Sequence, residues 1–347
     1  MKHPSTGVVF GSQFQAHDTG LQHPENPARS AVLETAIEEW QGPSLERVPA
    51  RAATLEEILR VHDLSHVEKI AATRSRPSTR LDPDTVAGRA SDTTARQAAG
   101  GLLDLIEAVD NRSLRNGFAF VRPPGHHATR SVSQGFCLFN NVAIAAMHLL
   151  QKYDRIAIVD FDVHHGNGTE EIFAHHSQVF YASLHQSPWY PGTGAASDIG
   201  YGTGAGYTAN VPLPAGAGDA EANLAMNDLL LPILYDFAPE FVLVSAGFDG
   251  HRRDPLGSLA YTEAGFHGWM GQLATLAEVT ADGRIAAVLE GGYDPDALAS
   301  SAQASLAALS SPERPKRWQE APSALTLDLR KLHRAQGPLA ARRPGES

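Results

Sequence analysis

The sequence predicts an α/β protein built around a mostly parallel β-sheet. Strand-like and helix-like segments alternate along the chain, an order that is typical of α/β folds. Hydrophobic residues make up 42% of the chain and charged residues 19%, which are values of a globular protein with a sizeable core. The 347 residues suit one large domain. Because no linker or repeat interrupts them, we expect a single domain over residues 1–347.

Five segments have the apolar, β-branched composition of buried strands: 117–122, 155–161, 179–185, 241–246 and 285–290. Seven segments have helical patterns: 29–40, 54–72 with a break near Asp63, 92–109, 139–152, 219–236, 263–280 and 295–309. Gly-rich stretches predict long loops at 192–206 and 214–218. The tail from Ser310 contains five prolines, and we expect its end to be loosely ordered.

The cysteine content and the N-terminal sequence predict a cytoplasmic protein. Cys137 is the only cysteine, so the chain has no internal disulfide, and a reducing compartment fits best. The segment Met1–Gly20 lacks the basic start and apolar stretch of a secretory signal. No apolar run approaches the roughly 20 residues of a membrane helix. We therefore expect no membrane association.

The charge of the chain is acidic and uneven. The net charge is −11, yet residues 311–347 hold eight Lys/Arg and four Asp/Glu, so residues 1–310 carry −15. A field of this sign opposes direct binding to nucleic acid and favours cationic partners. Solubility alone accounts for the acidity equally well.

Polar segments follow four of the five predicted strands. They are Pro-Pro-Gly-His126-His127, Asp162-Val-His164-His165-Gly, Gly-Phe-Asp249-Gly-His251 and Gly-Gly-Tyr293-Asp294. Ligands of open α/β sheets bind at the carboxyl ends of the strands. We therefore expect these side chains to form one site.

The segment after strand 155–161 predicts a metal site. Asp160, Asp162 and His164 share one face while the chain stays extended, and Asp and His are donors that suit zinc. A catalytic zinc usually has three protein ligands. Asp249, which also follows a strand directly, is the natural third. In isolation, Asp-x-His is as well explained by a solvated surface turn.

His126, His127 and Tyr293 are the candidate catalytic groups. Two prolines stiffen the approach to the histidines, and imidazoles beside a metal suit general acid–base catalysis. The alternatives are that the two histidines are a structural pair bonded to the backbone, or that they are two further metal ligands. Tyr293 follows two glycines, which permit close backbone approach. Its hydroxyl suits a donor to a developing oxyanion, although an aromatic plug over the strand end explains it equally well.

The sequence resembles the zinc-dependent histone deacetylase family, which includes bacterial acetylpolyamine amidohydrolases and histone-deacetylase-like amidohydrolases. The resemblance covers residues 8–310, is closest to the class II branch, and leaves 311–347 as a C-terminal extension. It is carried by motifs in family order: HPENPAR (23–29), RPPGHHA (122–128), GFCLFNNVA (135–143), DFDVHHGNGT (160–169), SLHQ (183–186), YPGTG (190–194), SAGFDGHRRDPLG (245–257) and LEGGYD (289–294).

The resemblance implies an arginase-like three-layer fold with a central, mainly parallel, eight-stranded sheet. It implies one zinc ion at Asp162, His164 and Asp249. His127 would be the general base, oriented by Asn167, where the class I branch has an aspartate. His126, paired with Asp160, would assist electrostatically or as the acid. Tyr293 would polarise the substrate carbonyl.

The resemblance also implies a tunnel and structural cations. The tunnel walls would be Gly135, Phe136, Tyr190 and Leu256, with Thr85, or Asp84 beside it, at the rim. For Leu256 in particular, core packing is a plausible alternative. A structural K⁺ or Na⁺ would take oxygens around Asp160, Asp162, His164, Ser183 and Leu184. A second such site would lie near Phe173, Val179 and Tyr207.

The expected activity is hydrolysis of N-acyl-lysine in proteins or peptides. Some polyamine deacetylases carry an acidic gatekeeper at the tunnel mouth, where this chain has Leu256, so acyl-lysine is favoured over acylated polyamines. One rival is a ureohydrolase, which shares the fold but uses two manganese ions and more aspartate ligands. The other is a non-catalytic binder of acyl-lysine. Relatives are often dimers or tetramers, so a homo-oligomer is compatible with the resemblance.

Overall fold

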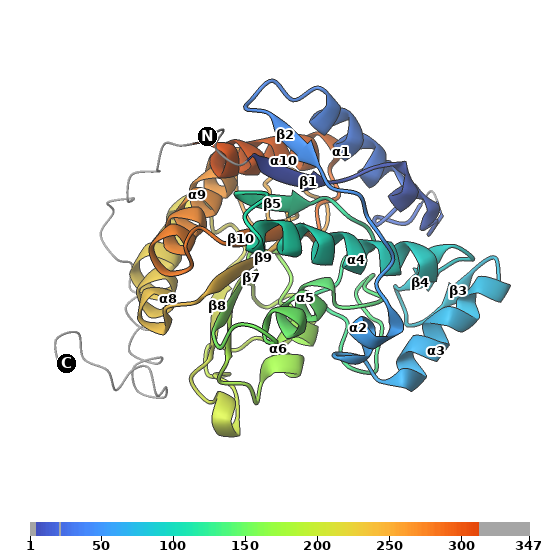
Figure 1. Ribbon diagram of the computed structural model, residues 1–347, viewed down its shortest axis with the longest axis horizontal. Coiled ribbons are helices and arrows are strands. Elements are labelled where there is room, and N and C mark those ends of the chain that lie inside the picture. The colour runs from blue at the N-terminus through green and yellow to red at the C-terminus, as the bar shows by residue number, and fades with distance from the viewer. Residues whose placement is uncertain (1–4, 21, 312–347) are drawn as a thin grey trace.

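A central parallel sheet lies between two layers of helices in the computed structural model, which describes residues 5–20 and 22–311 (Figure 1). The sheet has eight strands in the order β2-β1-β5-β10-β9-β6-β7-β8, and every neighbouring pair is parallel. The strands are β1 (Thr6–Val9), β2 (Leu45–Arg47), β5 (Asn116–Ala119), β6 (Ile156–Asp160), β7 (Val179–Gln186), β8 (Thr208–Leu213), β9 (Phe241–Ala246) and β10 (Ile285–Leu289). A separate antiparallel pair joins β3 (Thr79–Arg80) to β4 (Val86–Ala87).

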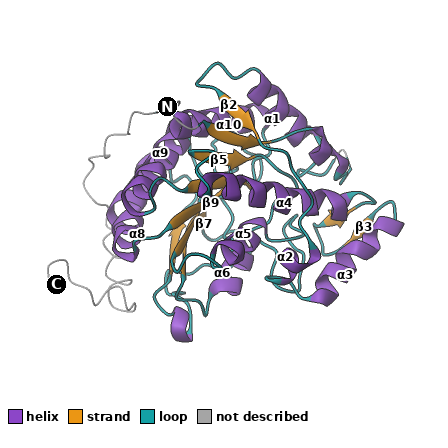
Figure 2. Ribbon diagram, in the orientation of Figure 1, coloured by secondary structure: helices purple, strands orange, loops and turns teal. Residues whose placement is uncertain are grey.

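The helices form one layer on each face of the sheet (Figure 2). One layer contains α1 (Ala28–Glu38), α7 (Asp219–Ala225), α8 (Leu231–Phe237), α9 (Glu263–Thr280) and α10 (Pro295–Ser310). The other contains α2 (Leu55–Leu59), α3 (Leu64–Ala72), α4 (Ser91–Asp110), α5 (Asn141–Leu149) and α6 (Asn167–Phe173). Buried strand residues alternate between the two cores, as Val242 and Val244 face the first layer while Phe241 and Leu243 face the second.

The strands that carry the polar segments are neighbours. β5, β10, β9 and β6 are adjacent in the middle of the sheet, in that order. Because all four are parallel, their carboxyl ends meet at one edge. The topology therefore brings together segments that are far apart in the sequence, such as Gly117 of β5 and its register partner Ala286 of β10.

All five predicted strands and all seven predicted helical regions are present, with shifts at their ends. The predicted helix 219–236 is divided by a π-helical turn at Met226–Leu230, and the loop 192–206 contains a 3-10 turn at Gly202–Gly204. The sequence did not predict β1, β2, β3, β4, β8 or α6. The tail beyond Ser311 lies outside the described residues. Within the described chain, no helix combines the length and the hydropathy of a membrane span.

Candidate active site

Asp162, His164 and Asp249 meet at the carboxyl ends of β6 and β9. One donor atom from each lies within 4.8 Å of the other two, and all three residues are buried. The chain is not extended here, because β6 ends at Asp160. Instead, the Asp162 N–H donates to Asp160 Oδ1 at 3.1 Å and the His164 N–H donates to Asp162 Oδ1 at 2.9 Å. These local side-chain bonds, typical of aspartate turns, bring Asp162 and His164 to the same site.

The charges of this cluster suit a divalent cation. His164 Nδ1 lies 3.1 Å from Asp162 Oδ1 and 3.1 Å from Asp249 Oδ2. Burial alone would lower the pKa of His164, but the two carboxylates outweigh it and raise the pKa to about 10. Burial and the charge of Asp162 raise the pKa of Asp249 to about 7. Two buried carboxylates thus have only the protonated His164 to balance them. A divalent cation that replaced this proton would meet two carboxylate oxygens and a neutral imidazole nitrogen, a donor set that zinc accepts.

Glycines beside the cluster leave room for its oxygens. A Cβ atom on Gly291 would lie 2.0 Å from Asp249 Oδ2, and one on Gly247 would lie 2.0 Å from Asp162 Oδ2. The Gly291 N–H also donates to Asp162 Oδ2 at 2.8 Å. Any larger residue at either position would therefore displace a carboxylate oxygen of the cluster.

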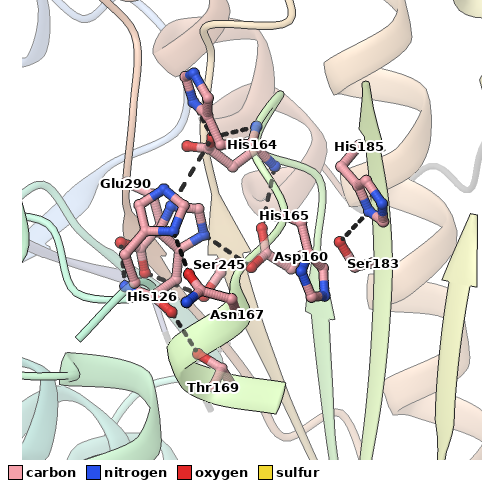
Figure 3. Close-up of polar contacts among 12 residues, drawn as sticks. His126, Asp160, His164, His165, Asn167, Thr169, Ser183, His185, Ser245 and Glu290 are labelled. Carbon is pink, nitrogen blue, oxygen red and sulfur yellow. Dashed lines mark hydrogen bonds and ion pairs between the residues drawn. The ribbon is translucent and has the colours of Figure 1, made fainter. Parts of the chain in front are cut away.

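His126 and His127 differ in the partners of their Nδ1 atoms. His126 Nδ1 lies 3.0 Å from Asp160 Oδ2 (Figure 3). His127 Nδ1 lies 2.8 Å from Asn167 Oδ1. Carboxylate and amide oxygens only accept hydrogen bonds, so both Nδ1 atoms carry a proton. In a neutral His127 the Nε2 atom is therefore left as a proton acceptor.

The two imidazoles have opposite pKa shifts. Burial and the positive charges of His126 and His164 hold the pKa of His127 well below its usual value of 6.5. Burial also disfavours charge on His126, but Asp160 and Asp162 outweigh it and raise the pKa of His126 to about 10. A neutral imidazole beside a protonated one is an arrangement suited to general acid–base catalysis.

Glu290 holds the backbone that carries these histidines, and the sequence did not single it out. Its Oε2 atom accepts from the N–H groups of Gly125 at 2.6 Å and His126 at 3.1 Å. Its Oε1 atom accepts from the Ser245 hydroxyl at 3.1 Å (Figure 3). Burial raises the pKa of Glu290 to about 7. A charged residue at the end of an otherwise apolar strand, Ile285 to Leu289, was the available signal.

A pocket of about 250 Å³ opens onto the site. Its walls are Asp84, Pro124, His126, His127, Gly135, Phe136, His164, Trp189, Tyr190, Leu256, Gly291 and Tyr293. The Tyr293 ring meets the Phe136 ring edge-on, with centroids 5.8 Å apart. Burial raises the pKa of Tyr293 well above 10, so its hydroxyl keeps the proton that it would donate.

The predicted tunnel residues lie around this pocket, with one difference. Gly135, Phe136, Tyr190 and Leu256 line it. Thr85 is fully buried, and its hydroxyl accepts a hydrogen bond from the Phe136 N–H at 3.0 Å. The neighbouring Asp84 lines the pocket instead. Thr85 thereby fixes the backbone of Phe136, whose φ of 68° is unusual for a bulky residue.

Gly135 and Trp189 shape the pocket in ways that the sequence did not reveal. The φ of Gly135 is +54°, and a Cβ atom there would lie 2.3 Å from the His127 ring, so a side chain would push the imidazole aside. Trp189, which the sequence did not single out, is 41% exposed, and its Nε1 atom donates to the Leu256 carbonyl at 2.8 Å. A tryptophan inside a long, polar loop was the only sequence signal.

The residues expected around a structural cation are also neighbours. Asp160 and Ser183 are register partners of β6 and β7, and Leu184 is buried beside them. Asp160 accepts from the Tyr181 hydroxyl as well as from His126. The Ser183 hydroxyl is 2.9 Å from His185 Nδ1 (Figure 3). This environment is polar and buried, and it lies at the same strand ends as the Asp162–His164–Asp249 cluster.

Comparison with known proteins identifies the family. A family model for the histone deacetylase domain matches residues 23–309. The chain belongs to the histone deacetylase family. It is similar to a probable deacetylase of Archaeoglobus fulgidus, with 40% identity over 292 residues that cover 83% of this chain and 81% of the relative. It is also similar to histone deacetylase 14, chloroplastic, of Arabidopsis thaliana, with 39% identity over 307 residues that cover 83% and 73%.

The histone deacetylase family also accounts for the fold. The crystal structure of the HDA15 HD domain matches with a TM-score of 0.88 and 36% identity, over 97% of each chain. The predicted arginase/deacetylase-like fold with its eight-stranded sheet is thereby confirmed. Deacetylases are hydrolases, so membership of this family gives the reaction class.

Proposed function

We propose that this protein is a zinc-dependent amidohydrolase that removes acyl groups, acetyl above all, from lysine side chains of proteins or peptides. Water adds across the amide C–N bond, and the products are a carboxylate and the free amine. The observation that carries the proposal is that His126, His127 and Tyr293 line one pocket together with His164, which belongs to the Asp162–His164–Asp249 cluster. Relatives named as deacetylases support the same reaction.

The protein's own side chains would move the protons. His127, with Nδ1 bonded to Asn167, takes a proton from the attacking water on Nε2. The Tyr293 hydroxyl donates to the substrate carbonyl oxygen as negative charge develops there. A protonated imidazole then gives a proton to the leaving nitrogen, and the C–N bond breaks. General acid–base catalysis is typically worth about 10²–10⁴-fold, and one oxyanion donor about 10²–10³-fold.

Asp162, His164 and Asp249 would hold the zinc ion. When bound, zinc supplies Lewis acidity to the carbonyl and to the attacking water. His126, bonded to Asp160, would stabilise the developing negative charge or act as the acid. A structural K⁺ or Na⁺ beside Asp160, Ser183 and Leu184 belongs to the proposal, as does a second near Phe173, Val179 and Tyr207.

The pocket wall supports an acyl-lysine substrate. Phe136, Tyr190 and Leu256 give it an apolar lining that suits the methylene chain of a lysine. Asp84 is the one carboxylate among the lining residues, and it suits an N–H donor of the substrate. Leu256 offers no charge to a second amine, which favours lysine over an acylated polyamine. The cellular location and the oligomeric state stay predictions.

The test is to measure substrate turnover by the zinc-loaded protein and to determine its metal content by elemental analysis. The substrates are an acetyl-lysine peptide, acetylputrescine, trifluoroacetyl-lysine and longer acyl-lysines. We expect one zinc per chain and a higher kcat/KM for acetyl-lysine peptide than for acetylputrescine. The reverse order would make the protein a polyamine deacetylase. Peptide binding without turnover would make it an acyl-lysine binder, and two manganese ions per chain would favour a ureohydrolase.

A further inference from the structure

Asp254 joins the loop after β10 to the loop after β9. Its Oδ2 atom accepts hydrogen bonds from the backbone N–H groups of Tyr293 at 2.6 Å and Asp294 at 3.2 Å. Its Oδ1 atom accepts from the N–H of Leu256 at 2.9 Å. Asp254 is only 7% exposed, so these bonds form largely out of water, where they are stronger. One carboxylate thus holds two pieces of the pocket wall together.

The rest of this wall is also held through backbone atoms. The Leu256 carbonyl accepts from Trp189, so Leu256 is held at its N–H and at its C=O. On the other side, the Gly292 carbonyl accepts from Arg29 Nε at 2.7 Å. Between these anchors, the N–H of Tyr293 has Asp254 as its acceptor. The direction in which the Tyr293 ring leaves the backbone therefore depends on that contact.

We propose that Asp254 is a positioning residue for the reaction, because it sets the backbone from which the Tyr293 hydroxyl is presented to the pocket. This inference rests on the proposed function, since the placement of Tyr293 affects the rate only if its hydroxyl stabilises the reacting carbonyl. A carboxylate is required at this position because both of its oxygens accept. In Asp254→Asn the amide nitrogen would face an N–H of Leu256 or the N–H groups of Tyr293 and Asp294.

A double-mutant cycle with the full-length zinc protein and an acetyl-lysine peptide tests this role. Small displacements of a reacting group reduce rates by up to about 10²-fold, so we expect Asp254→Asn to lower kcat about 10-fold or more. KM should change less than about threefold, because the side chains that line the pocket are unchanged and the Leu256 carbonyl is still held by Trp189. In the Tyr293→Phe background the same change should lower kcat less than about threefold, because residues that act through one group are not additive.

Asp219→Asn is the matched control. Asp219 also accepts a backbone N–H, that of Thr262 at 2.9 Å, but it does not line the pocket. We expect the Asp219→Asn substitution to lower Tm without a comparable loss of kcat. Should Asp254→Asn fold poorly, Asp254→Ser keeps one accepting oxygen, adds no fixed N–H donor and should show the same non-additivity. Zinc content and Tm are measured for every variant.

The outcomes separate this inference from the proposed function. Equal losses from Asp254→Asn in both backgrounds would show that Asp254 does not act through Tyr293 and would overturn the inference. Loss of zinc from Asp254→Asn would overturn it as well, since the residue would then support the metal cluster. A wild-type protein without turnover, or a fully active Tyr293→Phe variant, would contradict the proposed function itself and remove the basis of the inference.

Discussion

His127 Nδ1 lies 2.8 Å from the amide oxygen of Asn167, so this buried imidazole is paired with a neutral group. His126, next to it in sequence, is paired with the Asp160 carboxylate instead. An amide oxygen orients the ring without the charge that would stabilise an imidazolium. The pairing therefore favours an imidazole that is unprotonated when water must give up a proton.

Asn167→Asp should shift the pH profile. A carboxylate beside Nδ1 stabilises the protonated imidazole and raises the pKa of His127. Because the base must be unprotonated, the acidic limb of kcat/KM should move to higher pH. The check is a kcat/KM–pH profile of both proteins at equal zinc content. An unchanged acidic limb would show that His127 is not the group whose protonation limits the rate.

His127→Ala should remove activity and leave the metal in place. The His127 imidazole is not among the three convergent donors Asp162, His164 and Asp249, so zinc should stay at one per chain by elemental analysis. The loss of kcat should reach about 10²–10⁴-fold, as for other general bases. If zinc is lost with the imidazole, His127 is a ligand and its role as base is wrong.

Tyr293→Phe should lower kcat by at least about two orders of magnitude with zinc still bound. The change removes only the hydroxyl, so the edge-on contact with Phe136 remains and Tm should change little. Steady-state kinetics with the acetyl-lysine peptide provide the measurement. Activity equal to that of the wild type would exclude Tyr293 as an oxyanion donor.

Gly291→Ala should weaken metal binding. The added Cβ would lie 2.0 Å from Asp249 Oδ2, so a donor oxygen must move. Gly268→Ala is the control, because its Cβ would have no atom within 4 Å and it lies inside α9, where alanine is favoured over glycine. Titration with zinc should show weaker binding for Gly291→Ala alone. Equal zinc affinity in the two variants would place the metal elsewhere.

Leu256→Glu should change the substrate preference towards cationic amines. The side chain lines the pocket, and a carboxylate there would attract the second amine of an acetylated polyamine. We expect the ratio of kcat/KM for acetylputrescine to that for acetyl-lysine peptide to rise about 10-fold or more, as one additional charge contact is worth about 1.4 kcal/mol or more. An unchanged ratio would show that residue 256 does not contact this part of the substrate.

Apolar periodicity and strand-end motifs are local signals, so they predicted an α/β fold with a mostly parallel sheet, whereas the arginase-like fold with eight strands was implied by the resemblance to the family. The sequence also predicted that Asp162, His164 and Asp249 would lie near one another, since strand ends of a parallel sheet share an edge. The reason given for Asp162 and His164, an extended chain, was wrong, because β6 ends at Asp160. Aspartate-to-backbone hydrogen bonds place them instead, and such bonds leave no periodic pattern.

Asp254, Glu290, Asp84 and Trp189 were missed or left open for a different reason. Asp254 and Glu290 act on backbone N–H groups of loops that are up to 165 residues away, and no pattern in the sequence indicates which loops will meet. The choice between Asp84 and Thr85 at the rim depended on which way one short turn faces. Such details are set by tertiary packing rather than by residue type.

Leu256 contributes its side chain to the pocket, whereas its position is set by main-chain bonds to Asp254 and Trp189. At this point of the wall, the bonds that hold the backbone are therefore independent of the side chain that lines the pocket. A substitution at position 256 alters the size and charge of the pocket without removing either bond. The side chain at position 256 can therefore change which acyl amine the pocket accepts, while the catalytic groups stay where they are.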